Sequence, residues 1–307
     1  LIDADGFIYK YEKSNYNLDQ VNPGKMLFLL YDKTKDPRYK KVIDTLRSQL
    51  ATQPRTSEGG FWHKEIYPYQ MWLDGLYMAA PFYAEYALRN NQAGDFEDVV
   101  RQFLLVAKHT YDPSTGLYRH AFDDSRQMPW ADKTTGQSPH AWGRAMGWYT
   151  MAIVDALDFI PENQPGRDEM IRILNGIVET LARIQDQATG GWYQVLDRSG
   201  VEGNYIETSC TSMFTYSILK GVRKGYLDKK YLAVGEKAYK GLIGNFIITD
   251  DKGLVTLTRI CGVAGLGGNP YRDGSFEYYI REEIRNNDPK GVAPFIMASI
   301  EYESISE

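Results

Sequence analysis

Hydrophobic residues recur at helical spacing over most of this chain. Between Tyr69 and Asn90 the apolar positions fall on one face of a helix, and the segment from Phe96 to His109 repeats the pattern. Further helices are expected over residues 20–31, 36–53, 139–160, 166–187, 205–225, 229–245 and 290–303. About nine or ten helices of this length leave almost no room for a sheet, so the pattern predicts an all-α fold.

A short polar turn with a glycine, followed by an aromatic or extended patch, comes after a helix four times. These turns lie at residues 57–62, 114–118, 188–193 and 251–255. Their spacing of about 56 to 75 residues is long enough for a helical hairpin with its loops. Because the chemically rich residues lie in such loops, a closed (α/α) barrel that gathers them on one rim is preferred to an open solenoid. We expect one domain over residues 1–307.

Composition and charge narrow the classes of function. A chain of 307 residues with 43% apolar and 24% charged residues can bury a large core, and no stretch resembles a membrane span. The net charge of −5 and the lack of basic runs argue against nucleic-acid binding. Cys210 and Cys261 have no zinc-finger spacing and are expected to be buried thiols. The chain starts at Leu1 without Met or a signal-like segment, as expected after processing or trimming, so the compartment (bacterial cytoplasm or periplasm) is not specified. The sequence does not specify the oligomeric state either.

Trp130-Ala131-Asp132 places a carboxyl group beside an indole in an expected loop. A carboxyl that loses water contacts has a raised pKa and can hold a proton near neutral pH, as a general acid must. Asp132 is therefore the expected acid, and Trp130 is expected to contact the substrate. The alternative is that Asp132 caps a turn at Thr134 or Thr135. The aromatic content of 13% suits sugar rings, which pack on flat apolar faces with polar edges.

Asp74 follows Trp72 near the start of an otherwise apolar helical stretch. It could be a structural carboxylate stabilised by the helix dipole. We favour a second active-site carboxylate, which would bond sugar hydroxyls and raise the proton affinity of Asp132 through like charge. Trp72 is expected to contact the sugar.

Two arginines are candidates for binding an acidic sugar. Arg144 follows Trp142 at the opening of a helix, where the helix dipole does not favour a cation. Its planar guanidinium could take a uronic acid carboxylate through two parallel bonds, and a surface salt bridge is the alternative. Arg272, beside the glycine-rich stretch, is a second candidate. The indoles of Trp142 and Trp148 are expected to flank the sugar.

The histidines are expected to bond sugar hydroxyls rather than a metal. His63 and His120 lie in the aromatic loops, and their separations from each other and from His140 match no metal-ligand motif. The glycine-rich residues 262–274 lack the preceding strand and following Lys-Ser/Thr of a phosphate-binding loop. No metal or cofactor is expected.

At these residues the sequence resembles glycoside hydrolase family 105, the unsaturated rhamnogalacturonyl hydrolases. The matching stretches extend from about residue 10 to the C-terminus and include residues 53–63, 67–75, 130–132, 138–144, 191–194, 264–268 and 271–275. The resemblance implies an (α/α)6 barrel of six hairpins, here with part of the first hairpin missing. It implies an enzyme that removes a terminal 4,5-unsaturated uronic acid from lyase-generated oligosaccharides, by default of the rhamnogalacturonan (pectin) type.

The resemblance also assigns roles to residues. The family's acid matches Asp132 and its second carboxylate matches Asp74, while Trp192 resembles an indole that lines the sugar site. By analogy, Asp132 protonates C4 of the C4=C5 double bond, and water then attacks C5. The resulting hemiketal opens and releases the remaining sugar. A small unsaturated oligosaccharide is thus the expected partner.

Three other functions remain open at this stage. An inverting glycosidase on the same barrel would use Asp74 and Asp132 as the two carboxyl groups that flank a saturated glycosidic bond. A polysaccharide lyase would need a Tyr, His or Lys base and would create a double bond rather than consume one. A sugar-binding scaffold would bind without turnover.

Overall fold

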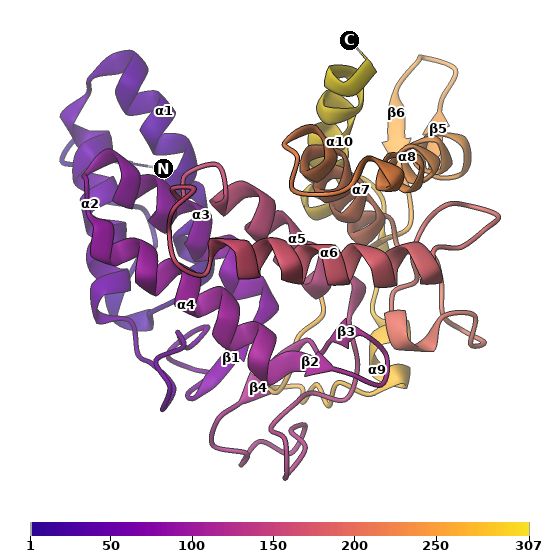
Figure 1. Ribbon diagram of the computed structural model, residues 1–307, viewed down its shortest axis with the longest axis horizontal. Helices are drawn as coiled ribbons and strands as arrows, with labels where there is room; N and C mark the ends of the chain where they lie inside the picture. Colours follow the sequence, from indigo (N-terminus) through magenta and orange to yellow (C-terminus); the bar gives the residue numbers. More distant parts are fainter. Residues whose placement is uncertain (1, 307) are drawn as a thin grey trace.

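The computed structural model describes residues 2–306 as a ring of paired helices (Figure 1). The α-helices are α1 (Lys25–Thr34), α2 (Pro37–Thr52), α3 (Leu73–Arg89), α4 (Ala93–Thr110), α5 (Gly143–Ala156), α6 (Arg167–Ile184), α7 (Thr208–Arg223), α8 (Leu232–Phe246), α9 (Phe276–Arg281) and α10 (Pro289–Ser306). Short 3-10 helices are η1 (Lys13–Asn15), η2 (Leu18–Gln20), η3 (Asn22–Gly24), η4 (Leu196–Arg198) and η5 (Lys229–Tyr231).

The long helices form an inner and an outer layer. Helices α3, α5, α7 and α10 pack side by side in the inner layer, and α4, α6 and α8 pack against them from outside. Helices α1 and α2 form a hairpin that extends the ring beyond α3. The predicted all-α barrel of helical hairpins is confirmed, and nine of its helices lie within a few residues of the expected ranges.

Strands occur only as four two-stranded antiparallel ribbons in the described residues. They pair β1 (Gln70–Trp72) with β4 (Ala121–Asp123), β2 (Tyr111–Asp112) with β3 (Leu117–Tyr118), β5 (Ile247–Thr249) with β6 (Val255–Leu257), and β7 (Ile260–Cys261) with β8 (Ile284–Arg285). In Figure 1 the first two ribbons and α9 lie along the lower edge, while the β5–β6 ribbon lies at the upper right. The turn at residues 251–255, between β5 and β6, therefore lies away from the edge that carries the turn at residues 114–118, between β2 and β3.

The recurring turns do share a backbone feature. Gly59, Gly116, Gly190 and Gly253 all have φ between +72° and +96°. This left-handed region is open to glycine because it has no β-carbon. The glycines recognised in the sequence therefore mark the reversals between helices.

The inner helix α7 shows how the barrel packs tightly. Every residue from Thr208 to Gly221 is buried. The hydroxyl groups inside this helix donate to backbone carbonyls one turn earlier, as in Thr215 to Thr211 and Ser217 to Met213. Small side chains that satisfy their own polar groups allow neighbouring helices to approach closely. Cys210 and Cys261 are buried free thiols, as the sequence predicted.

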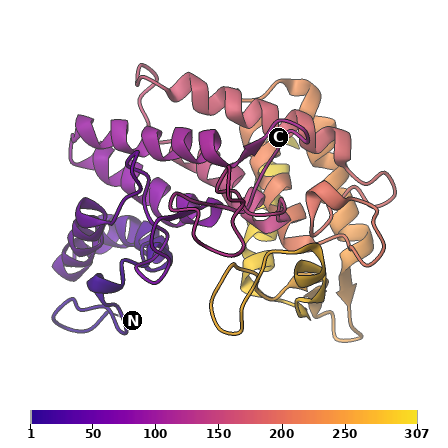
Figure 2. The same ribbon diagram turned by 90° about the horizontal axis from the view of Figure 1, so that it is seen from below.

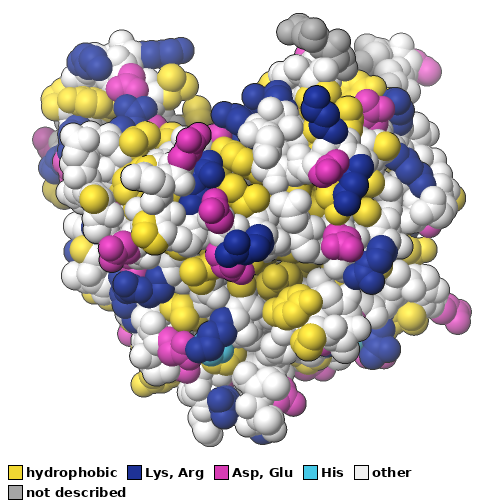
Figure 3. All heavy atoms as spheres, viewed as in Figure 1, with side chains coloured by type: hydrophobic (Ala, Val, Ile, Leu, Met, Phe, Trp, Pro, Cys, Tyr) yellow, Lys and Arg dark blue, Asp and Glu magenta, His cyan; other side chains and the backbone are white. Residues whose placement is uncertain are grey.

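The ring is indented between its first and last helices. Helix α1 lies on one side and α10 on the other, and the surface is hollowed between these two lobes (Figure 3). The view from below shows the segment that carries α9 against the C-terminal half, apart from the α1–α2 hairpin (Figure 2). Within residues 2–306, no helix has the length and apolar character needed to cross a bilayer.

Two glycines of α8 provide a matched test of this packing. A β-carbon at Gly241 would lie 1.8 Å from the backbone oxygen of Thr189, whereas one at Gly244 would meet no atom within 4 Å. We expect Gly241→Ala to lower the free energy of unfolding by about 1–3 kcal/mol through overpacking. Gly244→Ala should raise it by about 0.5–1 kcal/mol, because alanine favours a helix. Urea unfolding followed by circular dichroism measures both, and equal midpoints would contradict the packing described here.

Candidate active site

A cleft of about 480 Å³ lies between the N-terminal segment, the inner helices and α10. Its polar and aromatic lining comes from η2 and η3, from β1 and the loop before it, from α3, from α5 and the residue before it, from the loop before α9, and from the first turn of α10. These lining residues are Asp19, Asn22, His63, Lys64, Tyr67, Trp72, Asp74, Tyr77, Trp142, Arg144, Trp148, Arg272 and Lys290. The cleft thus brings together seven residues that the sequence analysis selected: His63, Trp72, Asp74, Trp142, Arg144, Trp148 and Arg272.

Asp74 faces His120 at the inner end of this cleft. It lies in the first turn of α3, with its side chain 15% exposed, while the side chain of His120 is fully buried. Asp74 Oδ2 is 3.3 Å from His120 Nε2, and neither atom has a hydrogen-bond partner among residues 2–306. A buried carboxylate oxygen without a bond is costly, so this atom is available to a ligand.

The surroundings of Asp74 act on its proton affinity in opposite directions. Burial raises the pKa of Asp74, because it disfavours the charged carboxylate. The imidazoles of His120 and His63 outweigh burial and lower the pKa below its ordinary value. For His63, burial lowers the pKa. In the free protein Asp74 is therefore ionised at neutral pH.

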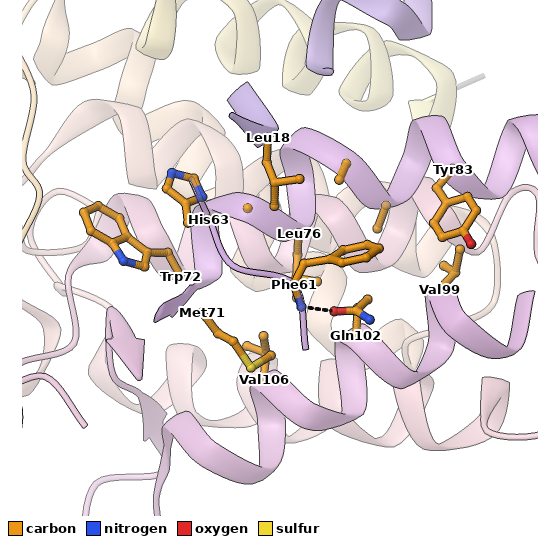
Figure 4. A pocket seen from close by; sticks show the side chains of 13 residues that line it. Leu18, Phe61, His63, Met71, Trp72, Leu76, Tyr83, Val99, Gln102 and Val106 are labelled. Carbon is orange, nitrogen blue, oxygen red and sulfur yellow. Dashed lines mark hydrogen bonds between the residues drawn. The ribbon is translucent and has the colours of Figure 1, made fainter. Parts of the chain in front are cut away.

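Three rings form a stack along one wall of the cleft. His63 lies 4.9 Å from Trp72, with 7° between their planes, and Trp72 lies 4.9 Å from Tyr67, with 13° between theirs. Gly75 makes this possible, because a β-carbon there would lie 2.9 Å from His63 Nδ1. Figure 4 shows His63 and Trp72 at one end of a small apolar cavity, with Leu18 beside His63. Gly75 and Leu18 thus lie behind the histidine of the stack.

Asp19 is a carboxylate of this cleft that the sequence analysis missed. It lies in η2, half-exposed, with Oδ1 3.4 Å from His63 Nε2 and Oδ2 2.5 Å from Lys64 Nζ. Its sequence signal was weak, since Asn17-Leu18-Asp19-Gln20 reads as an ordinary polar turn. Only the fold brings it to the histidine.

Arg144 is a structural residue of the cleft floor. Its side chain is 1% exposed and 3.7 Å from the fully buried Glu207. It donates to Ser209 Oγ at 2.8 Å, to the backbone oxygen of Gly262 at 3.3 Å and to that of Cys261. The alternative of a surface salt bridge is wrong, because this ion pair is buried. Three of its five N–H groups are engaged in this way, and Glu207 already compensates its charge.

Arg272 has more freedom toward the cleft. It donates through Nε to the backbone oxygen of Gly267 at 2.9 Å and through Nη2 to Tyr67 Oη at 3.0 Å. Nη1 has no hydrogen-bond partner within the described part of the chain, and it lies against Gly265, where a β-carbon would be 2.3 Å away. The absence of a side chain at Gly265 therefore leaves room for the guanidinium of Arg272, whose Nη1 keeps an unpaired donor.

A second aromatic platform lies across the cleft. Trp148 is half-buried and stacks on Tyr77, with 4.7 Å between ring centroids. Lys25 Nζ lies 3.5 Å from the centroid of the same tyrosine ring. Burial lowers the pKa of Lys25 to about 8. Trp142 is buried beneath the site, 4.8 Å from His120, and holds that ring in place.

The predicted environment of Asp132 is wrong. Asp132 is exposed, and its Oδ1 accepts from the backbone nitrogens of Thr134 and Thr135 at 2.9 and 2.7 Å. These bonds lower its pKa, which is the reverse of the expected shift. It lies in a separate, open depression with Arg119 and Thr135. The alternative interpretation, an aspartate that caps a turn, describes this residue.

Two predicted sugar-binding indoles also lie outside the cleft. Trp192 is fully buried, donates to the backbone oxygen of Leu181 and packs on Phe214, so it belongs to the core. Trp130 is buried against Trp72 and Leu266 and supports the wall from behind. The two predictions are wrong for the same reason. An indole near a loop can bury its apolar surface in the core as well as against a ligand.

The remaining histidines have structural partners. His140 Nδ1 lies 2.7 Å from Asp197 Oδ2. Burial raises the pKa of Asp197, but the hydrogen bond and charge of this imidazole outweigh burial and leave the pKa lowered. His109 lies 3.1 Å from Glu58 and stacks on Phe122. Among residues 2–306, no group of three or more His, Cys, Asp or Glu side chains is arranged to hold a metal ion.

Comparisons with known proteins agree with this architecture. A family model described as Glycosyl Hydrolase Family 88 matches residues 2–306. The solved structure of a C. acetobutylicum ATCC 824 glycoside hydrolase from family 105 has 49% sequence identity and a TM-score of 0.97, covering 99% of this chain and 84% of that one.

Two curated relatives extend the comparison. Protein Atu3128 of Agrobacterium fabrum is 42% identical over 233 residues, 73% of this chain and 97% of that protein. The unsaturated rhamnogalacturonyl hydrolase YesR of Bacillus subtilis is 28% identical over 222 residues, 70% of this chain and 60% of YesR. The chain therefore belongs to glycosyl hydrolase family 88, is similar to a solved member of family 105 over nearly its whole length, and is a glycoside hydrolase.

Proposed function

We propose that this protein removes a terminal 4,5-unsaturated uronic acid from lyase-generated oligosaccharides, with Asp74 as the proton donor. Rhamnogalacturonan fragments are the default substrates, in line with the name of its relative YesR. Asp132, the acid suggested by sequence resemblance, has no part in this proposal because it is exposed and engaged in a turn.

The free oxygen of Asp74 carries the proposal. Asp74 Oδ2 is buried at the inner end of an aromatic cleft, has no hydrogen-bond partner in residues 2–306, and faces His120 Nε2 at 3.3 Å. A general acid needs a proton when substrate is bound. The carboxylate of a bound uronic acid would add a negative charge nearby, and like charge raises the pKa of a carboxyl group. Substrate binding would thus favour the protonated form of Asp74.

The chemistry then follows the pattern of alkene hydration. Protonated Asp74 gives its proton to C4, the C4=C5 electron pair forms the new C–H bond, and C5 becomes oxocarbenium-like. Water attacks C5 and returns a proton to the Asp74 carboxylate. The resulting hemiketal opens and releases the remaining sugar. Asp74 ends in its starting state, so one carboxyl group serves as acid and then as base.

Arg272 is the proposed anchor for the uronate carboxylate. Its Nη1 is free of hydrogen bonds in the described residues, whereas each nitrogen of the Arg144 guanidinium already donates one bond, to Ser209 or to a backbone oxygen. A charge-assisted bond to a carboxylate is stronger than a neutral one. Arg144 is then a residue that shapes the floor through Glu207.

Asp19 and His63 are proposed to bind hydroxyl groups or the attacking water. Asp19 Oδ1 lies 3.4 Å from His63 Nε2, and both residues line the cleft. The platform of Trp148 and Tyr77 offers an apolar face to a sugar ring. These contacts would hold the ring while Asp74 reacts.

Asp74→Asn should lower kcat by about 10²–10⁴-fold, because the amide cannot donate a proton to C4. Asp132→Asn should keep kcat within about twofold of the parent, since its carboxylate serves only an exposed turn. Loss of the ultraviolet absorbance of the unsaturated uronide measures both rates. Circular dichroism checks that each variant is folded.

The reverse ranking of these two variants would refute the assignment of Asp74. Cleavage of saturated oligosaccharides would instead favour a conventional glycosidase. Absorbance that increases on a polymer would indicate a lyase. A panel of lyase-generated disaccharides separates these outcomes and identifies the sugar that follows the uronic acid.

Arg272→Ala should raise KM for an unsaturated uronide by about 10–100-fold, since a buried charge-assisted bond contributes about 1.5–3 kcal/mol. Its effect on kcat should be smaller. Arg285→Ala, which removes an exposed arginine paired with Glu283, is the control and should leave KM unchanged. A methyl ester of the uronic acid should lose affinity for the parent but not for Arg272→Ala. Equal discrimination by both proteins would contradict the anchor.

A further inference from the structure

Tyr279 makes a buried contact with the active-site histidine from the side opposite Asp74. It lies in α9, is fully buried, and places its hydroxyl 2.8 Å from His120 Nδ1. Trp142 packs against both rings, with centroids 4.8 Å from His120 and 6.1 Å from Tyr279. His120 is therefore held between a carboxylate at Nε2 and a phenol at Nδ1.

The direction of this hydrogen bond follows from counting donors and acceptors. Among residues 2–306, His120 Nδ1 is the one hydrogen-bond partner of the Tyr279 hydroxyl. If the hydroxyl accepted from Nδ1–H, its own proton would be left buried without an acceptor, which is costly. The tyrosine is therefore the donor and Nδ1 the acceptor.

The other ring nitrogen leads to the same arrangement. A neutral imidazole carries one proton, so an accepting Nδ1 leaves the proton on Nε2. That nitrogen faces Asp74 Oδ2 at 3.3 Å. A lone pair on Nε2 would face the ionised carboxylate unfavourably, whereas an N–H points a positive edge at it. Both ends of the ring therefore select the same tautomer.

We infer that Tyr279 is a positioning residue: it fixes His120 as the neutral Nε2–H tautomer and so leaves Asp74 able to take up the catalytic proton. A second proton on His120 would have to go to Nδ1, where the Tyr279 hydroxyl already donates. A neutral ring acts on Asp74 through its Nε2–H and lacks the full positive charge of an imidazolium, which would hold Asp74 as a carboxylate more firmly. The catalytic part of this inference rests on the proposed function, whereas the tautomer does not.

Other charged groups near this arrangement are few. Asp74 on α3 faces one end of the ring, and His63 from the loop before β1 acts on the same carboxylate. On the side of Tyr279, the groups that act on the phenol are Tyr278, Asp74, Asp197 and Cys261.

Nitrogen-15 NMR of the imidazoles tests the tautomer without substrate. The chain has four histidines, and the signals of His120 are identified by their loss in His120→Gln. In the singly protonated imidazole of the parent protein, we expect an unprotonated Nδ1 and a protonated Nε2. A proton on Nδ1 in that form would overturn the inference, whether or not any variant folds.

Tyr279→Phe tests the consequence for the reaction. This variant should lower kcat by about 5–100-fold with a smaller change in KM, the effect expected when one buried hydrogen bond is lost. The His120 spectrum should no longer show a single tautomer, because the hydroxyl that donates to Nδ1 is gone. Unchanged kcat and an unchanged His120 spectrum in a folded Tyr279→Phe would overturn the inference.

Tyr149→Phe is the matched control for a buried phenol. Tyr149 is fully buried and donates to the backbone oxygen of Phe103 at 3.1 Å, in the core rather than at the cleft. Loss of the Tyr149 hydroxyl should lower the free energy of unfolding without changing kcat or the His120 spectrum. If the parent shows no turnover of unsaturated uronides but has the Nε2–H tautomer, the proposed function fails while the assignment of the hydrogen bond stands.

Discussion

The site depends on one constraint: a carboxylate and an imidazole face each other in a space that water barely reaches. Asp74 and His120 lie 3.3 Å apart, one nearly and one fully buried, and the facing atoms have no other hydrogen-bond partner in residues 2–306. Such a pair is costly to fold, because buried polar groups normally satisfy each other. Their retention in a cleft is typical of a functional site, where proton affinity is set by neighbours rather than by solvent.

The barrel supplies the rigidity that this pair requires. The start of α3 fixes Asp74, the stack of His63, Trp72 and Tyr67 forms one wall, and Trp142 packs behind His120. Each wall is supported by a further layer: Trp130 behind Trp72, and the buried helices α5 and α7 behind Trp142. Glycines at close approaches, such as Gly75 and Gly265, allow these layers to touch.

Arg144 and Arg272 have the same side chain but differ in burial, and the difference decides which of them can bind a ligand. Arg144 is enclosed with Glu207, Ser209 and backbone oxygens, so its charge is compensated within the protein. Arg272 lies on a glycine-rich stretch and keeps a donor free of partners in the described chain. A buried charged side chain needs a partner within the protein, whereas a charged side chain at a cleft can keep a donor unpaired until a ligand binds.

The sequence by itself determined the helices, the turns with their left-handed glycines, and seven of the residues that line the cleft, because these depend on periodicity and on neighbours along the chain. Only the tertiary structure decided which carboxylate is shielded. Asp132 and Asp74 both follow an indole by two residues, yet the first is bound by its own turn and the second by a histidine from a distant loop. Asp19 and Tyr279 are likewise brought to the site only by contacts between segments that are distant in the sequence. Burial and hydrogen bonding between remote segments set these roles, and no local pattern encodes them.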